Sequence, residues 1–313
     1  MKKQLSKYMD IKRIEFIITW QCGGHCRHCQ IGDDINKRGS HRHVLSAYAT
    51  DAVKKIATVY KIGSVMTFGG EPLYYPDVTA AIHQMATECG VQTRQLITNG
   101  YFTNSVAESG RVANALADAG VNSLLLSVDA FHQEHISIEP VYRFAQDIIR
   151  AKIPGAVLYP SWLVSAAHQN PYNAKTKEIL EKFCHLPIKI GGHENQVVFL
   201  GHAANLLREY YQQTTVSLPK HPCSELLNVT NISIVPNGDV MVCGFMIGNI
   251  YKEDVLEIIT RYNPYENEGM RAILQGGVSQ LLSHAKKQGV AVNLSDYCDV
   301  CGVCETVAKQ LKA

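Results

Sequence analysis

Short apolar runs alternate along this chain with longer stretches in which apolar residues recur at helical spacing. The first apolar run covers 14–19, a helical pattern follows over 44–60, and a short buried strand is predicted over 64–68. Strands that alternate with helices in this way predict an α/β fold with a parallel sheet built from six β/α units. The remaining units pair predicted helices over 77–89, 105–119, 141–151 and 175–184 with strands over 92–97, 123–128, 156–163 and 188–191.

The alternation breaks near Gly201, where a second and smaller unit is expected. Two apolar strands over 229–235 and 239–242 flank Pro236-Asn237-Gly238, and Asn-Gly supplies the positive φ angles that a tight hairpin turn needs. Helical stretches then run to a group of cysteines near the C-terminus. We therefore expect an N-terminal extension over 1–12, a barrel over 13–200, a linker over 201–221 and a smaller domain over 222–313.

Three cysteines follow directly after the first predicted strand. Cys22, Cys26 and Cys29 have the spacing C-x3-C-x2-C, and the intervening glycines let the backbone curl so that the thiolates converge. A [4Fe-4S] cluster takes four protein ligands, one at each iron, so three cysteines leave one iron open for chemistry. Zinc held by these cysteines with His25 or His28 is the alternative. Ligand softness and count favour the iron–sulfur cluster.

A second motif, Gly69-Gly70-Glu71-Pro72, closes the second predicted strand. Together with the three cysteines it resembles the radical S-adenosylmethionine (radical SAM) superfamily. The resemblance implies a partial (β/α)6 TIM-type barrel whose SAM-binding [4Fe-4S] cluster generates a 5′-deoxyadenosyl radical that abstracts hydrogen from a substrate C–H bond. It also assigns the Gly-Gly-Glu-Pro segment to the methionine amino group of SAM. A plain turn is the alternative for this segment alone.

The same resemblance implies further SAM contacts after the next strands. Asn99, Ser127 and Asp129 occupy family positions that meet the carboxylate and ribose of SAM, and His28 stands where an aromatic residue usually lies against adenine. A turn residue is the alternative for Asn99, and a helix N-cap is the alternative for Asp129. His132 and His135 are candidates for proton carriers or substrate contacts, although surface histidines are commoner.

The C-terminal cysteines form a second candidate metal site. Cys223 and Cys243, with Gly238 between them, are followed by C-x2-C-x2-C near the C-terminus, and this pattern resembles a twitch or SPASM auxiliary-cluster domain. The resemblance implies one auxiliary [4Fe-4S] cluster, with zinc as the alternative. We expect the ligands Cys223, Cys243, Cys301 and Cys304, with Cys298 as a spare thiol that donates a hydrogen atom; alternatively Cys298 is a ligand and Cys304 is spare.

The resemblance to enzymes with such auxiliary domains suggests a substrate class. Many of them modify ribosomally made peptides, and Gly201-His202 resembles a Gly-Arg segment of those relatives. We therefore expect crosslinking or epimerisation of a peptide, although the chain starts its barrel too early for an N-terminal peptide-recognition domain. The alternatives are a small-molecule dehydrogenase or epimerase, such as those of aminoglycoside pathways, and a non-enzymatic iron–sulfur or zinc scaffold.

Composition narrows the other possibilities. The 313 residues are 46% hydrophobic and carry a formal net charge of +2, which provides no field for nucleic acid or an anionic membrane. Without a signal peptide or a spanning segment, the protein is expected in the cytoplasm, where its ten cysteines stay reduced. Expected partners are the substrate and a flavodoxin- or ferredoxin-type reductant. Cys89 and Cys184, on predicted helices, are read as small buried apolar side chains.

Overall fold

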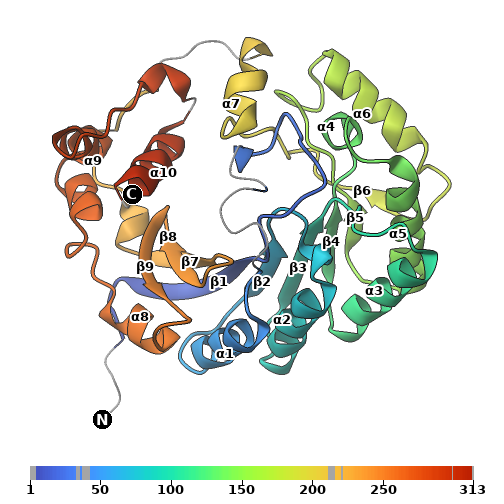
Figure 1. Ribbon diagram of the computed structural model, residues 1–313, viewed down its shortest axis with the longest axis horizontal. Helices are drawn as coiled ribbons and strands as arrows, with labels where there is room; N and C mark the ends of the chain where they lie inside the picture. The colour runs from blue at the N-terminus through green and yellow to red at the C-terminus, as the bar shows by residue number, and fades with distance from the viewer. Residues whose placement is uncertain are drawn as a thin grey trace.

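The chain folds around one mixed sheet. The computed structural model describes residues 5–32, 36, 43–210, 216–219, 221–297 and 299–311. Within these residues the strands run in the order β6-β5-β4-β3-β2-β1-β7-β8-β9. Figure 1 shows the strands around an open centre, with the helices on the outside. No helix in the described part of the chain combines the length and apolar character needed to cross a membrane.

The first six strands and their helices form the expected barrel units. Each strand pairs in parallel with its neighbour from β1 to β6, so the predicted α/β fold with a parallel sheet is confirmed. The strands are β1 Met9–Ile17, β2 Ser64–Phe68, β3 Thr93–Thr98, β4 Ser123–Leu126, β5 Ala156–Leu158 and β6 Lys189–Ile190. The helices are α1 Ser46–Ala57, α2 Pro76–Glu88, α3 Val106–Asp118, α4 Ala130–Gln133, α5 Ile138–Arg150 and α6 Pro171–Glu181.

The two faces of the sheet have different surroundings. Successive side chains of a strand point to opposite faces, and the helices cover the outer face only. On that face Ile14, Phe16 and Leu96 are fully buried among apolar helix residues. The alternate positions, such as Arg13 and Glu15, are partly exposed on the inner face. The barrel therefore has its hydrophobic core outside the strands and an accessible surface inside them.

Several element boundaries differ from the sequence prediction. Strand β1 begins at Met9, inside the expected extension, because charged Asp10 and Lys12 alternate with buried residues and mask the strand as polar sequence. Strand β5 stops before Pro160, which lacks the N–H that a continuing strand would need. Cys184 lies beyond the end of α6 and is exposed, so its prediction as a buried side chain is wrong. Helix α4 and strand β9 were not predicted.

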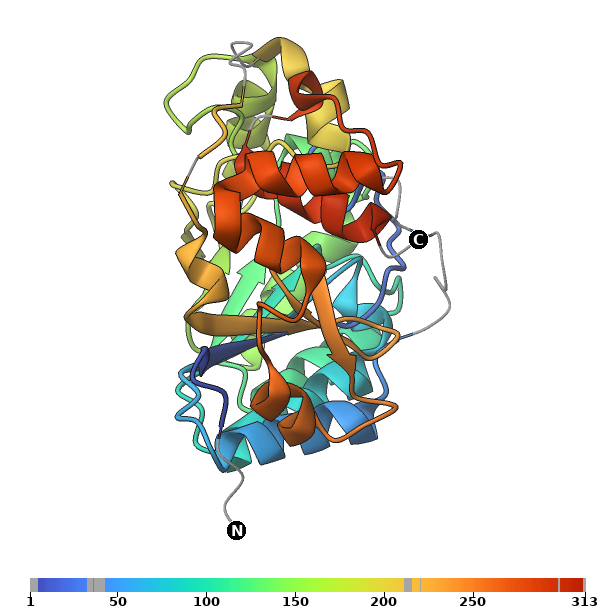
Figure 2. The ribbon, with the colours of Figure 1, turned by 90° about the vertical axis from the view of Figure 1, so that its left-hand side faces the viewer.

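The predicted hairpin extends the barrel sheet. Strand β7 Val229–Ile234 pairs in parallel with β1, and β8 Asp239–Val242 and β9 Phe245–Asn249 follow as antiparallel strands. The expected hairpin is therefore confirmed, and it is continuous with the barrel. In Figure 2 the red C-terminal helices lie above these orange strands. The helices after residue 200 are α7 His202–Leu206, α8 Val255–Arg261, α9 Glu268–Lys287 and α10 Val300–Gln310.

Candidate active site

The cysteine loop (residues 20–29) follows β1 at the carboxyl end of the barrel strands. Gly24 lies between two of its thiols: a Cβ at this position would be 3.1 Å from Cys26 Sγ and 3.6 Å from Cys22 Sγ. The Gly24 N–H also donates a hydrogen bond to Cys22 Sγ at 3.3 Å. Glycine at this position therefore leaves room for both sulfur atoms to lie close to the backbone.

The three thiols lie in surroundings that disfavour a bare thiolate. Burial raises the pKa of Cys22 to about 12 and also raises the pKa of Cys26 and of Cys29. Hydrogen bonds from the backbone of Ile31 and Gly32 partly oppose the shift at Cys29. A thiolate ligand here needs the positive charge of a metal to replace its lost hydration. The buried sulfur atoms and the N–H donors around them fit a bound iron–sulfur cluster.

Asn99 connects the end of β3 to the cysteine loop. Its Nδ2 lies 3.5 Å from Cys22 Sγ, and its backbone N–H donates to Glu71 Oε2 at 2.9 Å. Glu71 Oε1 accepts hydrogen bonds from Leu73 N–H and from the Thr98 hydroxyl. Burial raises the pKa of Glu71 to about 7, although these hydrogen bonds oppose the rise. In this structure Glu71 therefore ties the ends of β2 and β3 together beside Cys22.

The two glycines before Glu71 pack against the start of the cysteine loop. A Cβ on Gly69 would lie 2.7 Å from the Thr19 carbonyl oxygen, and one on Gly70 would lie 2.1 Å from the Gln21 carbonyl oxygen. The Gly70 N–H donates to Thr19 O at 2.8 Å. The glycine pair is required here for contact between two segments of the protein, and its contact with SAM stays a prediction.

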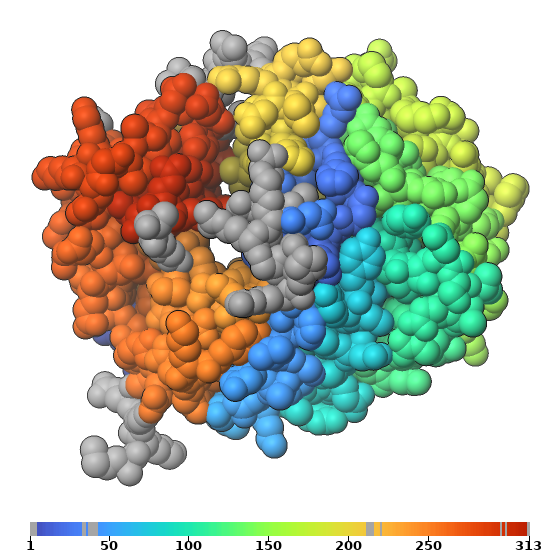
Figure 3. All heavy atoms as spheres, viewed as in Figure 1, coloured from blue at the N-terminus to red at the C-terminus, as the bar shows by residue number. Residues whose placement is uncertain are grey.

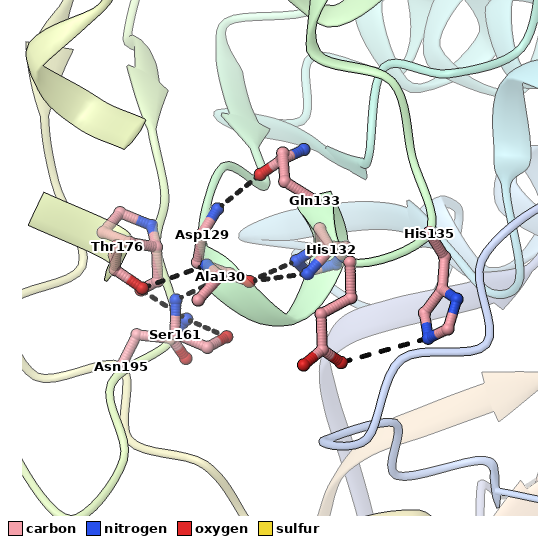
Figure 4. Close-up of polar contacts among 10 residues, drawn as sticks. Asp129, Ala130, His132, Gln133, His135, Ser161, Thr176 and Asn195 are labelled. Carbon is pink, nitrogen blue, oxygen red and sulfur yellow. Dashed lines mark hydrogen bonds and ion pairs between the residues drawn. The ribbon is translucent and has the colours of Figure 1, made fainter. Parts of the chain in front are cut away.

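Asp129 is fully buried at the start of α4 (Figure 4). Its Oδ1 accepts hydrogen bonds from the backbone N–H and the Nδ1 of His132, and its Oδ2 accepts one from Ser161 N–H at 3.0 Å. Burial disfavours the charged form, but the charge and hydrogen bond of His132 hold the pKa of this carboxyl well below its usual range. Asp129 thus acts as the N-cap of α4, and its contact with ribose remains a prediction.

His28, within the cysteine loop, packs against α4. Its ring stacks on Phe131 at 4.8 Å between centroids and meets the His132 ring edge-on at 4.7 Å. Burial, followed by the charge of His132, lowers the pKa of His28 to about 4, so the ring is neutral. Its Nδ1 is buried and has no hydrogen-bond partner among the described residues. The expected contact of His28 with adenine is not tested by these contacts.

Ser127 and His135 are the remaining predicted contact residues. Ser127 is buried, and its backbone N–H donates to Thr98 O at 2.8 Å beside Asn99. His135 is exposed, and its Nε2 lies 3.9 Å from Glu134 Oε2 (Figure 4). The structure thus brings Ser127 near the ends of β3 and β4, whereas His135 lies at the surface. The contacts of His132 and His135 indicate no substrate role for these two histidines.

Two further contacts with the cysteine loop were not predicted. The His202 N–H donates to Cys29 O at 2.9 Å, and a Cβ on Gly201 would lie 2.5 Å from that same oxygen. The side chain of Asn36 accepts from Cys22 N–H and donates to Cys22 O. Gly201-His202 was noticed for a family resemblance, but nothing in the spacing indicated that it packs on this loop. No local signal could identify Asn36.

The auxiliary thiols (Cys223, Cys243, Cys301 and Cys304) come from three separate segments. Cys223 precedes a 3₁₀ turn, Cys243 forms the β8–β9 turn with a positive φ of 47°, and the last two lie on one face of α10. The turn packs on α10, because a Cβ on Gly244 would lie 3.1 Å from Glu305 Cα. Burial and the neighbouring thiolate charges raise the pKa of Cys243 to about 11 and that of Cys304 to about 12.

The described sulfur atoms do not form a single-ion site as they lie. Four thiolates on one zinc ion lie roughly 4 Å apart, because the Zn–S distance is about 2.3 Å. In the described part of the chain, the three-residue set with ligand atoms all within 4.8 Å is His28, Asp129 and His132, and it includes no cysteine. Cys298 lies outside the described residues, so its role as spare thiol or ligand stays a prediction.

Residues 16–158, which include the end of β1, the cysteine loop and strands β2 to β5, match the Radical SAM superfamily. This segment is a radical SAM domain. The match confirms the superfamily that the three cysteines and Gly69-Gly70-Glu71-Pro72 predict, and with it the expectation of an enzyme domain. The SAM-binding [4Fe-4S] cluster is the cofactor implied by this superfamily.

Sequence relatives share part of the radical SAM domain. The chain is 26% identical over 125 residues to the GTP 3′,8-cyclase of Moorella thermoacetica, covering 40% of this chain and 36% of that protein. It is 28% identical over 134 residues to the GTP 3′,8-cyclase of Alkaliphilus metalliredigens, covering 43% and 39%. The chain thus spans less than two fifths of the length of either relative.

Solved structures resemble a larger part of the chain at low identity. BtrN in complex with AdoMet and 2-DOIA matches with a TM-score of 0.48 and 14% identity, over 88% of this chain and 89% of that one. Native anSMEcpe with bound AdoMet matches with a TM-score of 0.48 and 12% identity, over 96% and 99%. These values are too low for comparison residue by residue, and the site described above rests on this chain's own contacts.

Proposed function

We propose that this protein is a radical SAM enzyme that abstracts a hydrogen atom from a substrate C–H bond and carries one auxiliary [4Fe-4S] cluster. The observation that carries this proposal is the cysteine loop: burial raises the pKa of all three thiols, two of them lie beside Gly24, and Cys22 Sγ receives N–H donors from Gly24 and from Asn99. Cys22, Cys26 and Cys29 would hold the first cluster and leave one iron open for SAM. Once bound, the cluster and SAM supply a 5′-deoxyadenosyl radical.

The chain's own groups would prepare this site. Glu71 fixes the backbone of Asn99, so that the Asn99 amide stays directed at Cys22 Sγ. Gly201 and His202 close the other side of the loop through contacts with Cys29 O. These contacts hold three ligands in place before metal arrives, which reduces the ordering cost of binding.

The auxiliary thiols support a second, fully ligated cluster. Four sulfur atoms from Cys223, Cys243, Cys301 and Cys304 complete the ligand set of a [4Fe-4S] cube, and no open iron remains for substrate. Such a cluster suits electron transfer with the substrate better than direct substrate binding. A flavodoxin- or ferredoxin-type protein is proposed to reduce the first cluster.

The substrate class is the least constrained part of the proposal. The resemblance of the cysteine pattern to peptide-modifying enzymes favours crosslinking or epimerisation of a ribosomally made peptide. Dehydrogenation or epimerisation of a small molecule is the second candidate. A small-molecule substrate is supported by the sequence relatives, the GTP 3′,8-cyclases, whose name gives GTP as their substrate.

Anaerobic reconstitution tests the core of the proposal. The full chain is loaded with iron and sulfide, reduced with dithionite and incubated with SAM. We expect about eight irons per chain, four for each cluster, and release of 5′-deoxyadenosine. Replacing Cys22, Cys26 and Cys29 together by alanine is expected to abolish this release and to leave about four irons.

Cys89→Ala provides the matched control, because Cys89 lies on the outer side of the barrel against Met85. It is expected to retain iron content and SAM cleavage. Release of 5′-deoxyadenosine by the triple variant, or zinc in place of iron in the wild-type protein, would contradict the proposal.

A further inference from the structure

The inner face of the sheet carries a continuous row of polar and thioether side chains, which we call the inner belt. Register pairs connect its members from one strand to the next across seven strands, from β9 to β4. Parallel and antiparallel partners in register present their side chains on the same face. The members, in strand order, are Met246, Met241, Ser233, Glu15, Met66, Gln95 and Ser123.

Arg13 lies two residues before Glu15 on β1 and connects several of these residues through hydrogen bonds. Its Nε donates to Glu15 Oε1 at 2.7 Å, and its Nη2 donates to Gln95 Oε1 at 2.9 Å. Gln95 Nε2 donates to Ser123 Oγ at 3.3 Å, and Ser233 Oγ donates to Glu15 Oε2 at 3.1 Å. One polar network therefore extends from β7 to β4.

This network lies on a surface that the fold leaves accessible. The Arg13 and Glu15 side chains are 27% and 22% exposed, whereas their neighbours Ile14 and Phe16 on the outer face are completely buried. Figure 3 shows openings in the molecule along the inner side of the orange and red C-terminal part. Closed (β/α)8 barrels fill their interior mainly with branched apolar side chains. Here the chain places hydrogen-bonding groups at those positions instead.

The belt lies close to the cysteine loop along the barrel. Glu15 comes two residues before the end of β1, so it lies roughly 7 Å below that end at about 3.3 Å per residue. The layer between contains apolar residues of β1 to β4, namely Ile17, Phe68, Ile97 and Leu125. A molecule that reaches from the cysteine loop to the belt would contact apolar side chains first and polar groups at its far end.

The chemistry of the belt selects a type of ligand group. Arg13 and Glu15 form an ion pair, so neither charge is left without a partner for a charged ligand. A charged ligand would have to break this pair, which is costly in a partly buried site. Serine hydroxyls and the Gln95 carboxamide both donate and accept hydrogen bonds. Neutral groups that do the same, hydroxyls or amides, complement them.

We propose that the inner belt binds the far end of the substrate and selects molecules whose hydrogen-bonding groups there are neutral hydroxyls or amides. This inference rests on the proposed function, because it takes the cysteine loop as the place of reaction. Hydroxyl groups would come from a small polyol, and amide groups would come from a peptide. The two sources correspond to the two candidate substrate classes.

Ligand-detected NMR with the reconstituted full chain and SAM, without reductant, tests this inference. The neutral probes are myo-inositol and acetyl-glutamine methylamide, and their charged counterparts are glucarate and acetyl-lysine methylamide. One neutral probe is expected to bind at least about tenfold more tightly than its charged counterpart, the effect of one lost hydrogen bond to a charged or buried group. Preference for inositol indicates a polyol substrate, and preference for the amide indicates a peptide.

Two sets of variants locate the binding. Gln95→Leu with Ser123→Ala removes one end of the network, and Arg13→Met with Glu15→Leu removes both charges together, so that no unpaired charge is left behind. Each is expected to weaken the preferred probe at least about tenfold. The matched control, Gln84→Leu with Ser283→Ala, changes the same residue types at exposed positions and is expected to leave probe binding unchanged.

The inference is overturned if charged and neutral probes bind equally, if neither neutral probe binds, or if the belt variants lower the unfolding midpoint while probe binding stays as in the wild type. Release of 5′-deoxyadenosine is measured separately under dithionite. Release without belt-dependent probe binding removes the inference and leaves the proposed function. Belt-dependent binding without release leaves the belt as a ligand-binding site and removes the proposed function on which its role in substrate selection rests.

Discussion

The two thiol groups of this protein are assembled in different ways. The cysteine loop places three thiols within residues 22–29, and neighbouring segments hold the loop through Gly70, Glu71 and Asn99. The auxiliary thiols come from positions between Cys223 and Cys304, and two of them, Cys243 and Cys301, are exposed. The first group depends on local backbone geometry supported by tight packing, whereas the second depends on distant segments meeting.

This difference has a consequence for function. A loop that supplies only three ligands on a short segment leaves room at the fourth position, and its rigid surroundings keep that position available. Four thiols from a turn, a 3₁₀ segment and a helix can surround a cluster on all sides. Under the proposed function, the first group carries the reactive chemistry and the second carries electron transfer, so the two should respond differently to the same kind of change.

The largest expected effect comes from adding one methyl group beside the cysteine loop. In Gly70→Ala the new Cβ would lie 2.1 Å from the Gln21 carbonyl oxygen, so the loop must move. A displacement of about 1 Å at a reacting site costs about 100-fold in rate, and we expect at least this loss in 5′-deoxyadenosine release. Iron analysis should show that the auxiliary cluster is retained.

Gly90→Ala is the control for this substitution. Gly90 also has a positive φ, 70°, but a Cβ there would meet nothing within 4 Å. It is expected to cost about 1 kcal/mol of stability and to leave SAM cleavage intact. Equal loss of 5′-deoxyadenosine in both variants would show that the packing of the loop is not the cause.

The second prediction concerns the auxiliary thiols. Cys301→Ser with Cys304→Ser removes two ligands from α10, so iron is expected to fall from about eight to about four per chain. If the two groups act independently, SAM cleavage without substrate changes by no more than about twofold. Cys26→Ser is the matching change in the first group and should abolish that cleavage. Electron paramagnetic resonance of the reduced proteins distinguishes which cluster each variant has lost.

The barrel could be predicted from the sequence because its elements depend on local patterns. Val53 and Ile56 repeat at helical spacing over α1, and Ser105 marks the start of α3 as an N-cap whose side chain accepts from Glu108 N–H. The start of β1 could not be predicted, because Asp10 and Lys12 make it look polar. Helix α4, with four residues, is too short for a periodic signal.

The site was predictable to the extent that its residues are neighbours in sequence. The three cysteines of the loop were predicted from their spacing, and Asn99 from its resemblance to a family position after a strand. The contacts of Gly201 and Asn36 with the loop could not be predicted, because each contact joins residues that are not neighbours in sequence and neither residue stands in a local pattern. The inner belt was missed for a similar reason: Glu15 and Ser233 become neighbours only through the pairing of β1 with β7.

A third prediction compares the carboxylates that hold the two regions. Glu71 is buried with a pKa raised to about 7 from an ordinary value of 4.5, so folding favours its neutral form. Its contribution is therefore most favourable at low pH and is lost as the pH rises. Relative to Glu71→Gln, the unfolding free energy of the wild type should fall by about 2 kcal/mol between pH 5 and pH 7 and change little above that.

Urea unfolding of the metal-free protein in reductant measures this slope. Asp299→Ala is the comparison in the second region, since Asp299 caps α10 by accepting from Gly302 N–H. It is expected to lower stability by about 1 kcal/mol, as the loss of a helix cap does. A pH-independent difference between wild type and Glu71→Gln would mean that Glu71 remains ionised in the folded protein.

The smallest expected effect concerns the donor from Asn99 to Cys22 Sγ. Asn99→Asp keeps the acceptor for Tyr101 N–H but removes the amide donor and adds negative charge. Hydrogen bonds to cluster sulfur atoms stabilise the reduced state, so the midpoint potential of the first cluster should become more negative. SAM cleavage with dithionite should slow about tenfold, as is typical when a partner of a metal ligand is lost.

Because Asn99 is also a predicted SAM contact, the potential is measured without SAM. Asn122→Asp is the control, because Asn122 Oδ1 accepts from Arg94 N–H at the other end of β3. It should change neither the potential of the first cluster nor the rate of SAM cleavage. The potential of the auxiliary cluster should be the same in the wild type and in both variants. An unchanged potential in Asn99→Asp would assign any loss of activity to SAM binding rather than to the cluster.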